Sequence, residues 1–297
     1  MKGTFSPSMI FSSLNVDELA RLLSALLLRR PIIVIGENGG SVDLMLEYIA
    51  SFAPHRDKVI FGIDFITTRE YEEILRRERQ DLHAKRVVIV CPCRYVKMAL
   101  EKFSDFKGWV LGVLREPNND TNKIVEGVFR YSGPVEVLYL SDGVRMESLG
   151  DQERLYGFER QLIENAIVRT HTALSRMRKV IRRRIRGLRL DTDLSDILLD
   201  FSTEETMLKE ELLRNEVLNF VHAARRALIL LYKLRILNNV GMRDRISDRT
   251  LLQTILYPHI DIAGLLEFIR AEWGEDFGDL ISKSVIRSIS DWIDSLW

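Results

Sequence analysis

Three short apolar runs in the first half of the chain most restrict what it can fold into. They read IIVI from Ile32, RVVIV from Arg86 and VEVLYL from Val135, and none of them alternates strictly between apolar and polar residues. A strand with this pattern is buried on both faces, as in a parallel sheet that helices cover on either side. Segments with helical spacing separate the runs, so the sequence predicts an α/β fold with a mainly parallel sheet of about five strands.

The second half of the chain has a different character. After residue 147 the strand-like runs stop, and the spacing of apolar residues predicts helices over residues 153–187, 203–238, 248–270 and 279–296. Segments that contain glycine or proline separate these ranges. We therefore predict two domains, an α/β domain over residues 1–147 and an all-helical domain over residues 148–297.

Composition indicates a folded protein without a global charge. The chain has 297 residues, of which 46% are hydrophobic, and its 43 basic residues balance 43 acidic ones. Attraction to nucleic acid or to an anionic membrane would therefore be local. Charges interrupt the apolar stretches well before the roughly 20 residues of a membrane span, and no signal-peptide pattern is present, so we expect a cytoplasmic protein with no membrane span. A charged content of 29%, rich in arginine, is typical of proteins from thermophiles.

The segment GENGGS, residues 36–41, has the setting of a phosphate-binding loop, because it joins a predicted strand to the N-terminus of a predicted helix. A Walker A motif would place a glycine, a lysine and a Ser or Thr where Ser41, Val42 and Asp43 stand. Asn38 stands where a dinucleotide-binding motif has its second glycine. The groups that would hold phosphates in either motif are therefore replaced.

We interpret this segment as a tight turn between a buried strand and a helix. In this interpretation Gly36, Gly39 and Gly40 adopt positive φ, and Ser41 caps the helix that follows. The alternative is a degenerate anion or nucleotide site formed by the same four residues, since a helix N-terminus attracts negative charge. Both interpretations place the turn at one end of the predicted sheet.

Other residues that carry chemistry form no recognisable catalytic set. Cys91 and Cys93 are closer in sequence than most zinc ligands, so we expect inert thiols near a strand end, with a reactive thiol at the following helix start as the alternative. Glu37, Asp64 and Asp142 follow predicted strands, where carboxylates often serve the active sites of α/β folds. Because no nucleophile pair, phosphate loop or metal set accompanies them, we expect no enzymatic activity, no cofactor and no metal.

Opposite charges are concentrated in two adjoining blocks. Residues 169–189 contain nine Lys or Arg and no acid, and residues 191–211 contain eight acids and one lysine. One helical stripe of the basic block consists of Arg178, Arg182, Arg186 and Arg189. We interpret the basic block as a salt-bridged or partner-facing surface, with nucleic acid and an anionic lipid surface as alternatives. The two blocks could neutralise each other across a helical hairpin.

The segment Leu19–Phe65 resembles the central segment of DENN-type domains. Matching features are a leucine-rich helix end with a basic pair, a short apolar strand, a serine-started helix, a proline followed by basic residues, and a second apolar strand. They lie at Ala25–Arg30, Ile32–Ile35, Ser41–Ile49, Pro54–Arg56 and Val59–Phe65. The resemblance implies an α/β core followed by a helical half. DENN proteins bind small GTPases and promote nucleotide exchange, so the resemblance also implies a GTPase-like partner.

From these features we expect a non-catalytic regulatory or scaffold protein that acts through protein–protein contacts. Two alternatives stay open, a degenerate phosphate-loop nucleotide-binding protein that uses residues 36–41 and a nucleic-acid-binding protein that uses the basic helix over residues 169–189. Large apolar residues from Trp273 to Trp297 are expected to lie mostly in the core. The last tryptophan would dock the C-terminal helix on the body or on a partner chain, which leaves a homo-oligomer open.

Overall fold

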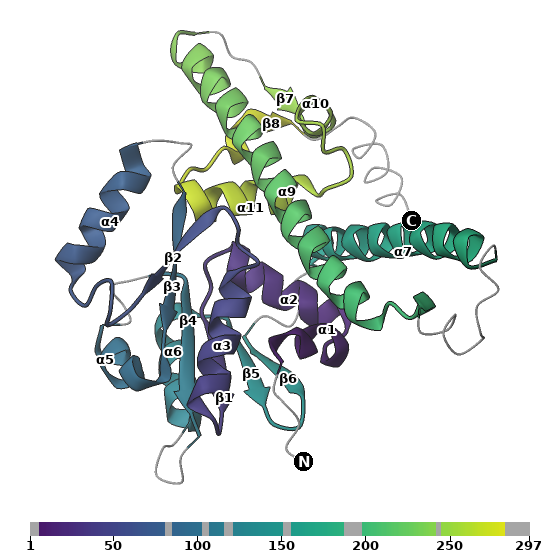
Figure 1. Ribbon diagram of the computed structural model, residues 1–297. Coiled ribbons are helices and arrows are strands. Elements are labelled where there is room, and N and C mark those ends of the chain that lie inside the picture. The colour runs from purple at the N-terminus through teal and green to yellow at the C-terminus, as the bar shows by residue number, and fades with distance from the viewer. Residues whose placement is uncertain are drawn as a thin grey trace, which may run out of the picture.

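A mainly parallel sheet forms the centre of the first half of the protein. The computed structural model describes residues 6–80, 85–102, 107–115, 121–150, 156–186, 198–241 and 245–282. The strands are β1 (Ile32–Gly36), β2 (Arg56–Ile60), β3 (Arg86–Cys91), β4 (Trp109–Leu114), β5 (Val135–Leu140) and β6 (Val144–Leu149). They lie in the order β2-β3-β4-β1-β5-β6 (Figure 1). The first five strands are parallel and β6 pairs with β5 in an antiparallel hairpin, which confirms the predicted α/β class.

Helices cover both faces of this sheet. Ile32 and Val34 of β1 point into the core beneath α2 (Val16–Leu27) and α3 (Gly39–Ala50), whereas Ile33 and Ile35 point to the opposite face. Three helices pack on that opposite face: α4 (Thr68–Gln80), α5 (Val96–Glu101) and α6 (Thr121–Ser132). Because both faces are buried, β1 has no polar positions, which explains the continuous apolar run in the sequence. The first residues form η1 (Pro7–Met9) and α1 (Ile10–Ser13), and η2 (Cys93–Tyr95) precedes α5.

The second half is built from helices, with one two-stranded ribbon. Its elements are α7 (Gly157–Arg186), α9 (Ser202–Asn239), β7 (Ile246–Ser247), α10 (Asp248–Thr254), α11 (Ile262–Trp273), η4 (Gly278–Leu280) and β8 (Ile281–Ser282). The single helix expected over 248–270 is wrong, because Leu256 adopts a φ of 63° and Asp261 caps a new helix by accepting the Gly264 backbone N–H at 3.3 Å. The helix expected over 279–296 is also wrong at its start, where η4 and β8 lie. Its remainder, 283–296, falls outside the described residues.

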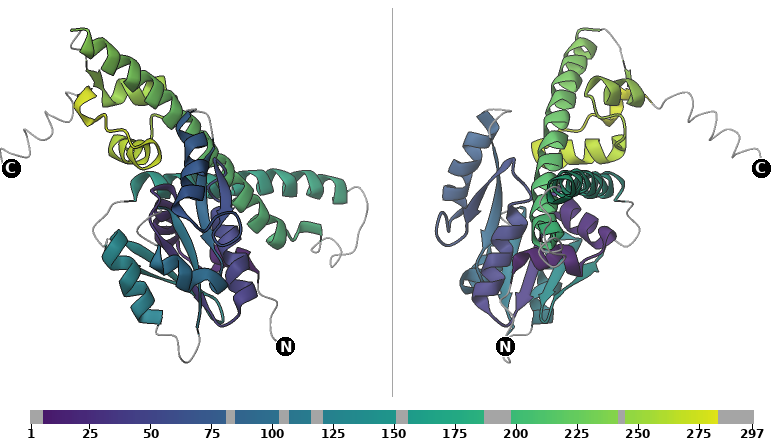
Figure 2. Two further views of the ribbon diagram at one scale, coloured as in Figure 1. Left: turned by 90° about the vertical axis from the view of Figure 1, so that its left-hand side faces the viewer. Right: turned by 45° about the vertical axis from the view of Figure 1, so that its right-hand side comes forward.

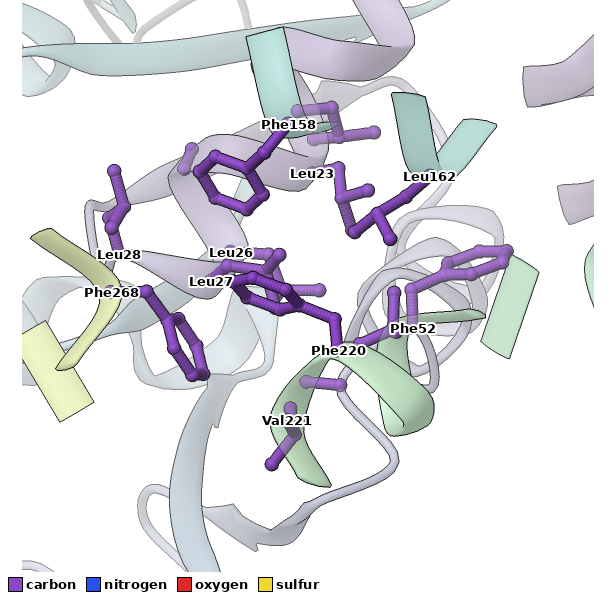
Figure 3. Packing of buried hydrophobic residues seen from close by; sticks show 14 of the residues in the cluster. Leu23, Leu26, Leu27, Leu28, Phe52, Phe158, Leu162, Phe220, Val221 and Phe268 are labelled. Carbon is purple, nitrogen blue, oxygen red and sulfur yellow. The ribbon is translucent and has the colours of Figure 1, made fainter. Parts of the chain in front are cut away.

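The two halves share one hydrophobic core. Leucines of α2, among them Leu23 and Leu27, pack against aromatic residues from three helices of the second half (Figure 3). The rings of Phe158 on α7 and Phe220 on α9 stack with centroids 4.9 Å apart, and Phe268 on α11 lies 4.9 Å from Phe220. The helical half therefore covers the α2 and α3 face of the sheet rather than standing apart from it.

A buried ionic cluster joins the same halves at the amino end of the sheet. Glu272 of α11 is completely buried and accepts hydrogen bonds from Arg29 Nε at 3.2 Å and from Arg56 Nε and Nη2 at 3.3 and 2.5 Å. Arg56 also donates to two carbonyls at the end of α2, and His55 Nε2 lies 3.5 Å from Glu272 Oε1. Burial favours a protonated Glu272, but the charges of Arg56 and Arg29 outweigh it and hold the pKa of this carboxyl below its usual value.

Candidate functional site

The carboxyl end of β1 lies where the sheet changes the direction of its connections. β1 has β4 on one side and β5 on the other. The chain leaves β1 through α3 on one face of the sheet and leaves β4 through α6 on the other face. Ligand crevices of open parallel sheets occur at this kind of position. The residues predicted from the GENGGS segment therefore lie where a ligand site would be expected.

The glycines of this turn do not adopt the conformation predicted for them. Positive φ occurs at other glycines, and Gly36, Gly39 and Gly40 are not among them, so the prediction of positive φ at these three is wrong. A Cβ at Gly36 would lie 2.8 Å from Val42 Cγ2 and 3.3 Å from Leu140 Cβ. Gly36 is therefore required by close packing between β1, α3 and β5. Gly39 and Gly40 form the first turn of α3 in ordinary helical conformation.

The helix N-terminus in this turn is capped by the protein itself. Asn38, not Ser41, is the N-cap of α3, and its Oδ1 accepts the Ser41 backbone N–H at 3.0 Å. A bound phosphate would need this N–H group. Val42, at the position of the Walker lysine, is fully buried and packs in the core. The Asn38 side chain thus occupies one amide of this helix N-terminus, and the position of the Walker lysine holds no cation.

A pocket of about 390 Å³ opens beside this turn. Its walls come from α3, η2, α5 and the end of β4, and its lining residues are Gly39, Asp43, Cys93, Arg94, Val96, Lys97 and Leu114. Asp43 Oδ1 accepts the Cys93 backbone N–H at 3.1 Å, so this carboxylate ties α3 to the segment after β3. The Arg94 guanidinium lies over the Tyr95 ring at 4.6 Å. The pocket has two cations but no set of groups that could carry out a reaction.

The two thiols near this pocket are held protonated. Cys91 is buried and Cys93 is partly buried. Burial raises the pKa of Cys91 to about 12, and burial together with the Asp43 carboxylate raises the pKa of Cys93 to about 12. A thiol with so high a pKa is a poor nucleophile at neutral pH. This agrees with the interpretation of inert cysteines and contradicts the alternative of a reactive thiol.

The three carboxylates that follow strands do not meet. Asp64 Oδ2 accepts the Ile60 backbone N–H at 2.6 Å in the turn after the outer strand β2, which lies three positions from β1 in the sheet. Asp142 lies in the β5–β6 turn, and Glu37 is exposed after β1. Among the residues described, no three His, Cys, Asp or Glu side chains gather closely enough to bind a metal ion. Asp64 therefore has the role of a turn-stabilising residue.

The predicted arginine stripe on α7 is only partly a surface. Arg178 is half-buried, and its guanidinium lies over the Phe201 ring at 5.7 Å, so it faces the start of α9. Arg182 is exposed. The side chain of Arg186 and the whole of Arg189 lie outside the described residues. Arg178 therefore contributes to packing between the helices rather than to an open face.

The basic block contacts α9 across the hairpin of α7 and α9. Arg169 on α7 forms an ion pair with Glu216 on α9, five residues beyond the acidic block. Within the acidic block, a hydrogen bond from Lys209 to Glu205 at 2.7 Å holds the pKa of Glu205 below its usual value, and the Arg178 charge adds to this effect. The effect of Arg178 on Glu205 is thus a described interaction between the two blocks.

Several other exposed residues of α7 make none of these contacts. We call them together the α7 outer face: Val168, Arg176, Met177, Lys179, Val180, Arg183 and Arg184. Within the described part of the chain, none of its four cations forms an ion pair. α7 and the start of α9 extend beyond the sheet as a two-helix arm (Figures 1 and 2). The sequence alone does not identify this face, because the rotation of α7 depends on its contacts with α9.

The described residues form an α/β protein with a projecting helical arm, and they bring together no recognisable catalytic set. Comparison with protein-family models, curated proteins and solved structures finds no match for the chain. The resemblance of Leu19–Phe65 to DENN-type domains therefore stays a prediction. In the part of the chain that the structure describes, no helix combines the length and apolarity needed to cross a membrane.

Proposed function

We propose that this chain is a non-enzymatic scaffold that binds an acidic surface of a partner protein through the α7 outer face. The observation that supports this function is a combination on one projecting helix: exposed aliphatic side chains, and cations that form no ion pair with the residues that the structure describes. Val168 and Val180 are 63% and 58% exposed. Aliphatic side chains exposed together with cations suit a protein contact, in which both can be used.

The aliphatic residues also distinguish a protein partner from nucleic acid. Phosphate binding needs only cations on one face, and single-stranded nucleic acid is usually also held by stacking on aromatic rings. The α7 outer face has no aromatic residue. Complete burial of one Val or Met side chain contributes about 1.5–3 kcal/mol, whereas an exposed ion pair contributes about 0–1 kcal/mol. Most of the affinity would therefore come from contacts that a phosphate backbone does not offer.

The first partner class to test is a small GTPase, because DENN-type domains bind such proteins. The resemblance of Leu19–Phe65 is the reason for this choice, and it concerns a part of the chain outside α7. Nucleotide exchange activity is not part of the proposal. The function proposed here requires only a stable complex with a protein partner.

A pull-down from an extract of the source organism tests the proposal. The bait is the full chain, as wild type and as the double variant Lys179→Glu/Arg183→Glu, in which two cations of the α7 outer face are reversed. A matched control, Arg69→Glu/Arg249→Glu, reverses two exposed cations on α4 and α10. We expect a protein that the wild type and the control capture equally and that the α7 variant captures at least tenfold less. A tenfold loss corresponds to about 1.4 kcal/mol.

Two results would contradict this function. Equal capture by all three baits would show that the partner binds elsewhere. Capture that nuclease treatment abolishes, followed by binding of the purified chain to DNA or RNA with a steep salt dependence, would favour the nucleic-acid alternative. Replacement of Val180 by Asp separates the two further, because it should weaken a protein complex strongly and a phosphate contact only modestly.

A further inference from the structure

A second pocket lies at the amino end of the sheet, where the helical half meets the α/β half. Its volume is about 330 Å³, and its walls come from the end of α2, the segment just before β4, and α11. The lining residues are Leu28, Arg29, Arg30, Lys107, Glu267, Arg270 and Ala271. Ligand pockets usually have a mainly apolar lining and volumes of about 300–1,000 Å³. A pocket of this size with a charged lining therefore suits a small, highly charged ligand.

The charges that line this pocket are mainly positive. Its four cations and one acid leave a balance of +3. Lys107 and Arg270 are exposed, and within the described part of the chain neither forms an ion pair. Arg30 Nη2 lies 3.4 Å from Glu267 Oε1, but the Glu267 side chain is 45% exposed. Because so exposed an ion pair is weak, an anionic ligand can take the place of Glu267 beside Arg30.

Arg29 is a fixed part of the pocket wall. It follows the C-cap of α2 with a φ of 56°, a left-handed conformation that usually belongs to glycine at this position. Its Nε atom donates to the buried Glu272 at 3.2 Å, and the Arg29 side chain is 13% exposed. Glu272 also accepts hydrogen bonds from Arg56, so it does not fully neutralise Arg29. A Cβ at Gly108 would lie 3.4 Å from Arg29 Cβ, so the residue next to Lys107 packs closely against this arginine.

We propose that this pocket binds a small anion with phosphate groups and that the bound anion links the two halves of the protein. Three of the four cations are arginines, and a guanidinium binds a phosphate group through two parallel hydrogen bonds. A phosphate group has oxygen atoms in several directions, which suits cations that come from three separate segments. The ligand stabilises the contact between α2, α11 and the start of β4, because it binds the folded protein only. Soluble phosphate compounds and phosphorylated lipid headgroups share this chemistry.

Calorimetric titration of the full chain with inorganic pyrophosphate, at constant ionic strength, tests the proposal. We expect binding that is at least about tenfold weaker in the pocket variant Lys107→Gln/Arg270→Gln, because hydrogen bonds between charged groups are lost. The control Arg69→Gln/Arg249→Gln removes two exposed cations on α4 and α10 and should bind as the wild type. Glu267→Gln should bind about two- to fivefold more tightly, because it removes the competing acid. Circular dichroism checks that each variant is folded.

Vesicles that contain a phosphoinositide lipid are the second probe, and they distinguish the two sources of phosphate. Binding to these vesicles without binding of pyrophosphate, lost in the pocket variant and kept in the control, would assign the ligand to a lipid headgroup. Binding of neither probe would overturn the proposal. An equal loss of binding in the pocket variant and the control would also overturn it, because it would show a general effect of net charge. Weaker binding by Glu267→Gln would contradict the position of the ligand beside Arg30.

Discussion

His55 makes the stability of this protein depend on pH in a way that one substitution should remove. The side chain is buried just before β2, with its ring 6.0 Å from the Phe268 ring and its Nε2 atom 3.5 Å from Glu272. Burial, followed by the positive charge of Arg56, lowers the pKa of His55 from 6.5 to about 3, against the opposing effect of Glu272. The folded protein therefore keeps this histidine neutral at every pH near neutrality.

The sign and size of the effect follow from proton linkage. Between pH 6.5 and pH 3 the unfolded chain binds a proton at His55 that the folded chain does not bind, so the free energy of unfolding falls as the pH falls. The contribution of His55 to the free energy of unfolding is fully present above pH 6.5. Below pH 6.5 it decreases by about 1.4 kcal/mol per pH unit. At pH 5 the loss is about 2 kcal/mol relative to pH 7.5, and it does not depend on whether the folded pKa is 3 or 4.

Urea unfolding at pH 7.5 and pH 5 measures this loss. The substitution His55→Gln removes the titrating group, so the variant should lose about 2 kcal/mol less stability than the wild type between the two pH values. His222→Gln, at an exposed histidine of α9, is the control and should behave as the wild type. If His55→Gln and the wild type lose the same stability over this interval, the burial of a neutral histidine beside Glu272 is refuted.

Further predictions concern the ionic cluster and the glycine turn, and urea unfolding at pH 7.5 measures each of them. Glu272→Ala leaves the buried Arg56 and the partly buried Arg29 without their carboxylate and should lower the free energy of unfolding by about 3–5 kcal/mol; a loss below 1 kcal/mol would contradict the pairing. Gly36→Ala should cost about 1–3 kcal/mol through overpacking, whereas Gly39→Ala should be neutral or stabilise by up to about 1 kcal/mol, so equal effects of the two would argue against a packing role for Gly36. Asn38→Ala should cost about 1 kcal/mol as a lost helix cap, and an unchanged stability would be inconsistent with this hydrogen bond.

Sequence patterns predicted the parallel strands that are buried on both faces well and the edge strand β6 poorly. A strand such as β1, buried on both faces, must be apolar at every position, and this property is visible in the sequence alone. β6 alternates buried and exposed residues because it lies at the edge of the sheet, and its exposed positions Arg145 and Glu147 pair with each other. Charged residues at alternate positions hid this strand from a search for continuous apolar runs.

The glycine turn shows why the geometry of a site is harder to predict than its chemistry. Replacement of the Walker lysine and hydroxyl by Val42 and Asp43 was visible from residue identity. The need for a glycine at position 36 was not visible from the sequence. It arises from close contacts of Gly36 with α3 and with Leu140 of β5, a strand about a hundred residues away in sequence. Asn38 is itself a preferred N-cap residue, and this signal could have identified it in place of Ser41.

The exposed side of the basic helix α7 was similarly hard to predict from the sequence. Helical spacing placed Arg178 on the same side as Arg182, but that side borders α9 rather than solvent. Leu174 and Ile181, four residues before and three residues after Arg178, belong to the packed side and could have indicated its direction. Which cations stay free depends on the second helix of the hairpin, and no local pattern in α7 contains that information.

Photo-crosslinking from position 180 tests whether the α7 outer face binds a protein. A photoreactive phenylalanine derivative replaces Val180 in the full chain, and the crosslinks are formed in an extract of the source organism. We expect a covalent adduct with one protein, whose yield falls when unlabelled wild-type chain is added and does not fall when the Lys179→Glu/Arg183→Glu chain is added. An adduct with nucleic acid alone, or equal competition by both unlabelled chains, would contradict a protein-binding function of α7.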